Sequence, residues 1–141
     1  MSDPHHLQRF LNAQSSIYDQ ACSELRAGRK RTHWMWFIFP QLAGLGHSET
    51  ARFYAIRSLA EAKAYLQHPV LGPRLVECTT LVTQIDGKTI HDILGSPDDM
   101  KFRSCMTLFE QAAAENTPFK EGLLKYFGGE SDPLTLEHLR G

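Results

Sequence analysis

The chain has 141 residues, of which 42% are hydrophobic, and its formal net charge at neutral pH is -1. This length and composition suit one folded domain with its own core. They exclude an intrinsically disordered chain and a fold that depends on metal or disulfide bonds. The nearly balanced charge excludes a general attraction to nucleic acid or anionic lipid, so such binding would need a local patch.

Helix-start and helix-stop signals recur along the chain, and no segment alternates between polar and apolar residues with period two. They predict helices at about residues 4–28, 33–39, 48–57, 59–68, 72–85, 89–94, 97–115, 117–128 and from 133 onward. The segment 33–39 is apolar on every side, so a strand also fits it. We favour a helix, because no other segment could pair with it as a strand. Residues 1–141 are therefore expected to form a single, compact, multihelical all-α domain of about eight helices.

Two of the predicted helix starts carry strong capping signals. Ser58 with Glu61 has the spacing of a capping box, in which hydroxyl and carboxylate satisfy two backbone N–H groups reciprocally. Ser96 stands before Pro97 and two aspartates, which combines a capping hydroxyl, a proline at the first position and acids at the positive helix end. We predict that Ser96 caps this helix and that Ser96→Ala costs about 1 kcal/mol.

Cys22, Cys78 and Cys105 are an odd number of cysteines at wide spacing, with no metal-binding signature. We expect three reduced, mostly buried thiols and no metal site. The first six residues lack a signal-peptide pattern, and the dense apolar run 34–39 is too short to cross a bilayer. These features predict a cytoplasmic protein that does not associate with membranes.

The segment 30–48 is the most unusual part of the chain and holds both of its tryptophans, Trp34 and Trp36. An indole offers a flat face for stacking on a base or sugar, His33 is a candidate general acid, and Gln41 offers a bidentate amide. The alternative is that these aromatic residues serve only the core. Because positions two apart on a helix point apart, at most one indole is expected to face a ligand.

A second cluster follows at Asp98, Asp99 and Lys101. Asp98 is simplest to interpret as complementing the helix dipole, whereas Asp99 is a candidate for acid–base work and Lys101 for binding phosphate. Arg57 and Arg74 lie near apolar helix faces, where a guanidinium must find a partner. Burying such polar groups is costly without partners, so we predict that they converge on one cleft. The predicted members of this shared cleft are His33, Gln41, Arg57, Arg74, Asp99 and Lys101.

These residues belong to a pattern that covers nearly the whole chain and resembles the domain-of-unknown-function family eighteen-ten, whose members are sometimes mislabelled calpastatin. The matching motifs are Leu7-x-Arg9-Phe10 with Ala13-Gln14, His33-Trp34-Met35-Trp36-Phe37-x-Phe39-Pro40-Gln41, Gly44-Leu45-Gly46-x-Ser48, Tyr54-x-Ile56, Glu61-Ala62-x-Ala64-Tyr65-Leu66-x-His68-Pro69-x-Leu71-Gly72-x-Arg74-Leu75, Asp99-x-Lys101-Phe102-x-Ser104 and Leu108-Phe109. The resemblance implies an all-helical fold without an established activity. A fainter similarity links the chain to NADAR proteins, which act on ADP-ribose-linked N-glycosides.

The leading hypothesis is a small-molecule site for a nucleotide or ADP-ribose-like ligand, extended by N-glycosidase chemistry and with no cofactor. His33 and Asp99 would be the catalytic pair. The candidate ligand-binding residues are Trp34, Trp36, Gln41, Arg57, Arg74 and Lys101. The alternative is a non-enzymatic protein-interaction module in which the aromatic segment is core. RNA binding through the basic run 29–31 ranks last, and we expect a monomer.

Overall fold

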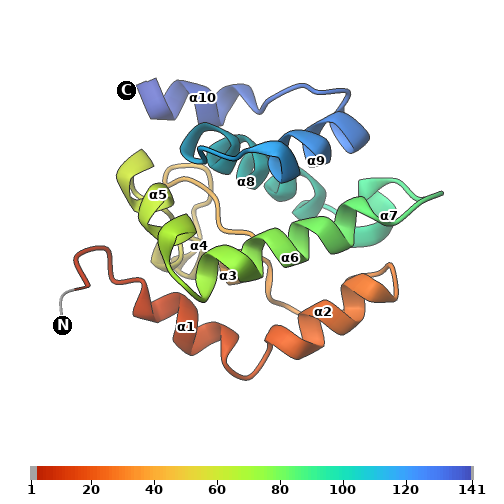
Figure 1. Ribbon diagram of the computed structural model, residues 1–141, viewed down its shortest axis with the longest axis horizontal. Helices are drawn as coiled ribbons and strands as arrows, with labels where there is room; N and C mark the ends of the chain where they lie inside the picture. Colours follow the sequence, from red (N-terminus) through yellow and green to blue (C-terminus); the bar gives the residue numbers. More distant parts are fainter. Residues whose placement is uncertain (1–2, 141) are drawn as a thin grey trace.

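Ten helices joined by short loops make up residues 3–140, the part of the chain described by this computed structural model (Figure 1). They are α1 (Gln8–Gln14), α2 (Tyr18–Arg26), α3 (Met35–Ile38), α4 (Glu49–Phe53), α5 (Leu59–Gln67), α6 (Leu71–Thr83), α7 (Ile90–Leu94), α8 (Asp98–Ala112), α9 (Thr117–Phe127) and α10 (Pro133–Arg140). The all-α prediction is confirmed, as is the helical form of the segment after His33. The number of helices is ten rather than about eight.

The first predicted helix is broken in two, which accounts for part of this difference. Ser15 and Ser16 lie between α1 and α2, and the Ser15 hydroxyl donates to the Asn12 carbonyl at 3.0 Å. Serine competes with the helical backbone for hydrogen bonds in this way, so it favours ends and turns over helix interiors. The apolar periodicity continues across the break, and it was this periodicity that suggested one helix.

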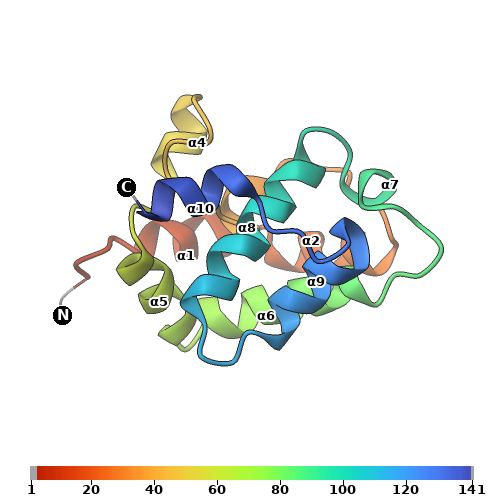
Figure 2. The ribbon, with the colours of Figure 1, turned by 90° about the horizontal axis from the view of Figure 1, so that it is seen from above.

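The helix α8 is the centre of the molecule and packs against α5, α7, α9 and α10 (Figure 2). Its residues 104–109 are buried without interruption, which is typical of a helix surrounded by others. On the other side, α6 packs against α2, α5 and α9. In Figure 1, α1 and α2 therefore lie below α6, while α8, α9 and α10 lie above it.

A continuous chain of aromatic side chains links the helices through the core. The rings of Phe10 and Tyr65 meet edge to face at 5.1 Å, and Tyr65 contacts Phe109 at 5.4 Å. Phe109 in turn contacts Phe119 of α9 at 5.9 Å. Such tilted and edge-to-face pairs add to the stabilisation that burial alone provides.

Most predicted helix starts are confirmed, and two are wrong. The first helix begins at Gln8 rather than at about residue 4. The side chains of Ser48, Ser58 and Thr89 cap α4, α5 and α7, and α9 ends at Gly128 in the left-handed conformation. Ser96 does not cap α8, because the capping position falls on Pro97, which has no side-chain acceptor. The N–H of Asp99 instead donates to the carbonyl of Gly95 at 2.8 Å.

The turn between α5 and α6 explains the His68–Gly72 motif structurally. The imidazole Nδ1 of His68 accepts the N–H groups of Val70 and Leu71 at 3.1 and 3.3 Å and so takes the part of a helix cap. At Gly72, an added Cβ would lie 2.1 Å from the backbone oxygen of Leu66. Only glycine therefore allows α6 to pass so close to the end of α5.

The three cysteines are free and buried, as predicted. None of the helices between residues 3 and 140 is long and apolar enough to cross a membrane. Within the same residues, no group of three His, Cys, Asp or Glu side chains is arranged to hold a metal ion.

Candidate functional site

The segment that carries the tryptophans is held in place by one buried carboxylate, that of Glu24 on α2. Its Oε1 accepts the N–H groups of Arg31 and Thr32 at 2.6 and 3.0 Å and the indole N–H of Trp34 at 3.0 Å. Its Oε2 accepts the hydroxyl of Thr32 at 2.6 Å and the amide of Gln20 at 2.9 Å. Glu24 therefore fixes the entry into α3 without any regular secondary structure.

The environment of Glu24 favours its ionised form. Burial alone would raise the pKa of this carboxyl group, but the hydrogen bonds from Thr32, Arg31 and Gln20 outweigh it and lower the pKa from 4.5 to about 2. A carboxylate that accepts several backbone N–H groups is expected to behave in this way. The anion is thus part of the folded structure at neutral pH.

The two tryptophans have different surroundings. Trp34 is completely buried, and Lys30 lies over its ring at 5.2 Å. Trp36 is half-buried, and the Nζ of Lys101 lies 5.4 Å from its ring centre. Of the two indoles, only Trp36 is open to a ligand, and Trp34 belongs to the core.

Asp98 joins the two lysines that lie over these rings. Its Oδ2 is 2.9 Å from the Nζ of Lys30, and its Oδ1 is 3.5 Å from the Nζ of Lys101. The side chains of Lys30 and Asp98 are 8% and 16% exposed, so the pair is well shielded from water. Two cations and one anion leave this group with an excess positive charge beside Trp36.

Gln41 is positioned by the loop that follows α3. Its carbonyl accepts the N–H of Ile56 at 2.9 Å, and the N–H of Ala43 donates to the Ile56 carbonyl at 2.8 Å. The loop can fold this tightly because Gly46 lies over α4, where an added Cβ would be 2.7 Å from the Cβ of Ala51. That Cβ would also be 3.3 Å from the side-chain nitrogen of Gln41, so Gly46 makes room for the amide.

A cleft of about 370 Å³ lies where this loop meets α8 and the start of α10. It is lined by Gln41, Leu45, Gly46, Pro97, Met100, Lys101, Ser104, Asp132 and Leu134. A much smaller hollow beside it shares Gln41 and Lys101 and includes Trp36. We call these two spaces together the Lys101 cleft. Its one lining carboxylate, Asp132, is occupied by hydrogen bonds from Ser104 and Thr135 at 3.0 and 2.6 Å.

The structure therefore brings together Trp36, Gln41 and Lys101 from the predicted set. His33 is exposed and does not line the Lys101 cleft. Asp99 does not line it either, and its Oδ2 lies 3.3 Å from the Nδ1 of His91. The positions of these two side chains give no support to a catalytic pair inside this cleft.

Arg57 and Arg74 lie elsewhere. Arg74 stacks over the ring of Tyr18 at 4.5 Å and donates to the Gln14 side chain at 3.2 Å, between α1, α2 and α6. Arg57 lines a separate hollow near the N-terminus. The prediction that all six polar residues share one cleft is therefore wrong, because Arg74 is satisfied locally by an aromatic face and an amide.

Sequence reasoning missed Glu24, Lys30 and Asp132 as residues that build the site. Asp132 precedes Pro133, which did mark the start of α10, but nothing in the sequence placed that start beside α8. Asp98 was interpreted through the helix dipole alone, although Lys101 three residues later was a signal for an ion pair.

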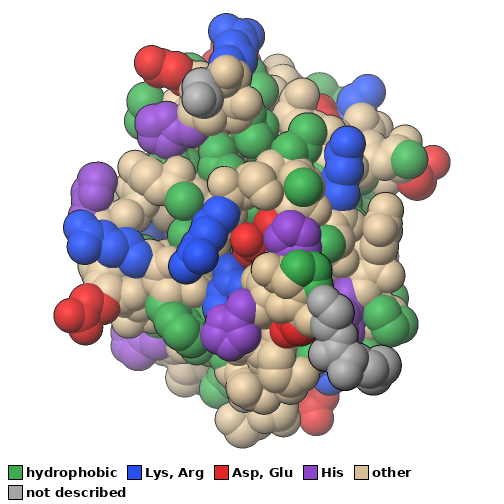
Figure 3. Space-filling model, turned by 90° about the vertical axis from the view of Figure 1, so that its left-hand side faces the viewer, with side chains coloured by type: hydrophobic (Ala, Val, Ile, Leu, Met, Phe, Trp, Pro, Cys, Tyr) green, Lys and Arg blue, Asp and Glu red, His purple; other side chains and the backbone are tan. Residues whose placement is uncertain are grey.

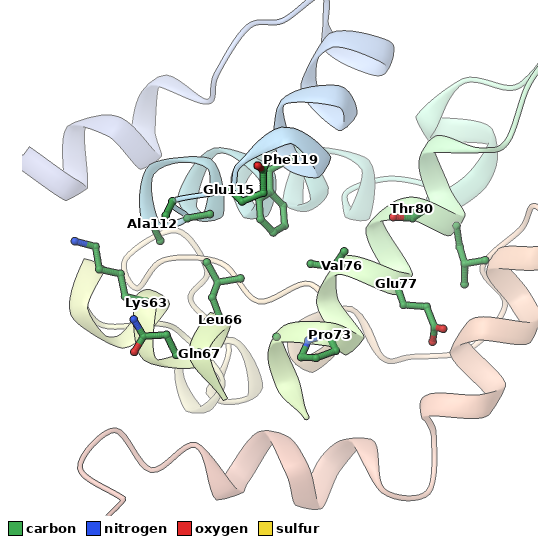
Figure 4. Close-up of a pocket in the computed structure, with 14 residues that line it drawn as sticks. Lys63, Leu66, Gln67, Pro73, Val76, Glu77, Thr80, Ala112, Glu115 and Phe119 are labelled. Atoms are coloured by element: carbon green, nitrogen blue, oxygen red, sulfur yellow. The ribbon is translucent and has the colours of Figure 1, made fainter. Parts of the chain in front are cut away.

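A larger space than the Lys101 cleft lies elsewhere, in a groove of about 940 Å³ between α5, α6 and the α8–α9 connection (Figure 4). Leu66, Val76 and Phe119 point into this groove, whereas the ammonium of Lys63 extends away from it. Glu77 at its edge accepts a hydrogen bond from Tyr18, and so it faces α2. The groove is thus apolar, and its charged groups do not converge.

Comparisons with known proteins agree with the motifs of the sequence. The chain is similar to a solved structure, that of a conserved hypothetical protein from Mycobacterium tuberculosis, with 55% sequence identity over 99% of each chain and a TM-score of 0.97. None of the curated proteins matches it. The family described as Protein of unknown function (DUF1810) matches residues 4–139, and the chain therefore belongs to this family.

Proposed function

We propose that this protein binds a small nucleotide-like ligand, of the ADP-ribose type, in the Lys101 cleft. The observation that supports this most strongly is that Lys101 and Gln41 border both parts of the cleft, next to the only tryptophan that is partly exposed. A cation, a bidentate amide and an indole are the groups that recognise a phosphate, a base edge and a ring face.

The size of the cleft and the free amide of Gln41 are compatible with such a ligand. Ligand sites span roughly 300–1,000 Å³, and the main space here is about 370 Å³. The ammonium of Lys101 is the group that would meet an anion, while the carboxylate of Asp132, which lines the same cleft, offsets the excess positive charge of Lys30, Asp98 and Lys101. The Gln41 amide forms no hydrogen bond within residues 3–140, so its donors and acceptor are available to a ligand.

Cleavage of an N-glycosidic bond by His33 and Asp99 is a separate step of this proposal. Neither residue lines the cleft, so a ligand would have to extend past the start of α8 to reach Asp99. Binding is therefore the function that we propose first, and hydrolysis depends on it. The faint similarity to NADAR proteins motivates the choice of ADP-ribose as a probe.

The test is a thermal-shift and calorimetric titration with ADP-ribose, NAD and AMP. Ligand at 100 times its Kd should stabilise the wild-type protein by about 2.7 kcal/mol. Lys101→Ala and Gln41→Ala should lose this shift while keeping a helical circular dichroism spectrum. The matched control is Lys63→Ala, which removes an exposed lysine of α5 outside the cleft. Equal shifts in the Lys101 and Lys63 variants would contradict the proposal.

A second candidate function, a protein-interaction module, is favoured by the apolar groove between α5, α6 and α9. Val76 is 36% exposed there, and Leu66 and Phe119 point into the same groove. Under this hypothesis none of the three probes raises the melting temperature. Val76→Glu then changes the association state measured by light scattering, whereas Lys101→Ala does not.

A further inference from the structure

The hollow near the N-terminus that Arg57 lines has a volume of about 210 Å³, and the buried side chain of Arg9 forms part of its wall. Arg9 is buried, and its guanidinium is fully used within the protein. It donates to the carbonyl oxygens of His5, His6, Phe53 and Ala55 at 2.7, 2.7, 2.8 and 3.0 Å and to the carboxylate of Glu61 at 2.7 Å. One side chain thus ties the N-terminal segment to the end of α4 and the start of α5.

This arrangement holds His6 in a conformation that side-chain-bearing residues rarely adopt. Its φ is 52°, in the left-handed region. Arg9 fixes this conformation by donating to the carbonyl oxygens of His5 and His6, which lie before and after the His6 Cα. Such a residue costs about 1–3 kcal/mol and persists only when its surroundings require it. The result is that the backbone of His5 and His6 is fixed at the wall of the hollow.

The side chains at the hollow carry an excess of positive charge. Arg9 and Glu61 neutralise each other, which leaves Arg57. The Arg57 guanidinium is exposed and forms no ion pair within residues 3–140. The remaining polar side chains lining the hollow are His5, His6 and Ser58. Each of them can donate a hydrogen bond to an anion.

Figure 3 shows the face of the molecule that carries the N-terminal segment. Blue Lys and Arg side chains and purple His side chains gather near its centre around a small acidic area. The acidic residue lining the hollow is Glu61, whose carboxylate is already bound by Arg9. An anion entering the hollow would therefore meet Arg57 without displacing an existing ion pair.

An apolar ring stands at the edge of the same hollow. Phe53 is 51% exposed, and His6 meets its ring edge to face at 6.2 Å. The volume, about 210 Å³, is below the range of roughly 300–1,000 Å³ that whole ligands occupy. The hollow thus suits one anionic group, with the rest of the molecule lying outside it against Phe53.

We propose that this hollow binds the phosphate group of a small organic phosphate monoester. Arg57, His5, His6 and Ser58 donate to the phosphate oxygens, and Phe53 contacts the organic substituent. A phosphate monoester carries close to two negative charges and three acceptor oxygens, which matches several donors around one unpaired guanidinium. This site is distinct from the Lys101 cleft and does not depend on the function proposed for it.

The test is an NMR titration of the whole chain with phenyl phosphate, inorganic phosphate and phenol, at constant ionic strength. We expect phenyl phosphate to bind with a Kd of about 1 mM or tighter and to shift the amide signals of Ser58 and its neighbours. Arg57→Gln should weaken binding about tenfold, the loss of one charge-assisted hydrogen bond. Arg52→Gln is the matched control, because Arg52 is an exposed arginine of α4 outside the hollow.

Three outcomes would overturn the proposal. Equal weakening by Arg57→Gln and Arg52→Gln would mean that only diffuse surface charge is involved. Inorganic phosphate binding as tightly as phenyl phosphate, with Phe53→Ala making no difference, would assign the site to free phosphate. No shift with either phosphate would mean that there is no site. Lys101→Ala should leave phenyl phosphate binding unchanged, which separates this test from that of the Lys101 cleft.

Discussion

At the scale of single residues, Glu24 is the side chain on which the Lys101 cleft most depends. It accepts five hydrogen bonds, three of them from the backbone and side chain of Thr32 and from Trp34. The segment 31–34 has no helix or strand to hold it, so these bonds determine where α3 begins. An uncharged amide cannot replace the carboxylate, because one of its two polar atoms can only donate.

Glu24→Gln should therefore destabilise the protein by at least about 2 kcal/mol, since it weakens charge-assisted hydrogen bonds and sets a donor against donors. Urea unfolding followed by circular dichroism measures the change. Gln20→Ala is the control for the loss of a single bond, because Gln20 is exposed and donates one hydrogen bond to Glu24, and it should cost less than Glu24→Gln. Equal stability of wild type and Glu24→Gln would show that segment 31–34 is held by other contacts.

The same residue predicts a difference in acid stability. The pKa of Glu24 is lowered from 4.5 to about 2 in the folded protein, so the unfolded chain binds the proton first as the pH falls. The stabilisation by Glu24 is complete above pH 4.5 and is lost between pH 4.5 and about 2. The stability difference between wild type and Glu24→Gln should narrow over this window in urea titrations. A difference that stays constant down to pH 2 would contradict the assignment.

At the scale of elements, the close approach of α5 and α6 sets the most stringent packing requirement. A Cβ on Gly72 would lie 2.1 Å from the Leu66 carbonyl oxygen, and backbone cannot give way as a flexible side chain can. At Gly122 of α9, the nearest atom to an added Cβ is the sulfur of Met106 at 3.2 Å, and this side chain can adjust.

Gly72→Ala should cost about 3 kcal/mol or more, because the two helices must separate. Gly122→Ala should stay within about 1 kcal/mol of wild type, since the helix propensity of alanine offsets the small clash. Urea midpoints of the two variants measure this difference directly. Similar midpoints would mean that the α5–α6 turn shifts more easily than its geometry indicates.

Helix boundaries were largely predictable from the sequence, because caps and stops are local. Thr89 and Asp92 form a complete capping box around α7, and Gly128 ends α9. Ser58 caps α5, but the Glu61 carboxylate pairs with Arg9 rather than completing the capping box. The pairing of Glu61 with Arg9 could not be predicted from the sequence, since it depends on how α1 packs against α5.

At the scale of the whole molecule, the three thiols report on the integrity of the core. Burial raises the pKa of the Cys78 and Cys105 thiols, so almost no reactive thiolate is present near neutral pH. Iodoacetamide should label these cysteines slowly in the native protein and rapidly in urea, as measured by mass spectrometry. Reducing agent should not change the melting temperature. Rapid labelling of native Cys105 would indicate that α8 opens far more often than its burial suggests.

The arrangement of the helices, unlike their boundaries, could not be predicted from the spacing of residues. Trp36, Gln41 and Lys101 meet because the loop after α3 passes over α8, a tertiary relation that periodicity does not contain. Arg74 carries a similar charge, yet it faces α1 and α2. Chemical type therefore indicates which residues could bind a ligand, while only the fold decides which of them share a space.

The short segment 53–57 borders both the hollow beside Trp36 and the hollow near the N-terminus. Tyr54 and Ala55 line the space next to Trp36, and Phe53 and Arg57 line the hollow near the N-terminus. A ligand that displaces this segment on one side changes the walls on the other, and binding free energies are reciprocal. Occupancy of either hollow would then alter the affinity of the other by one common factor, and this segment would act as a thermodynamic coupling element.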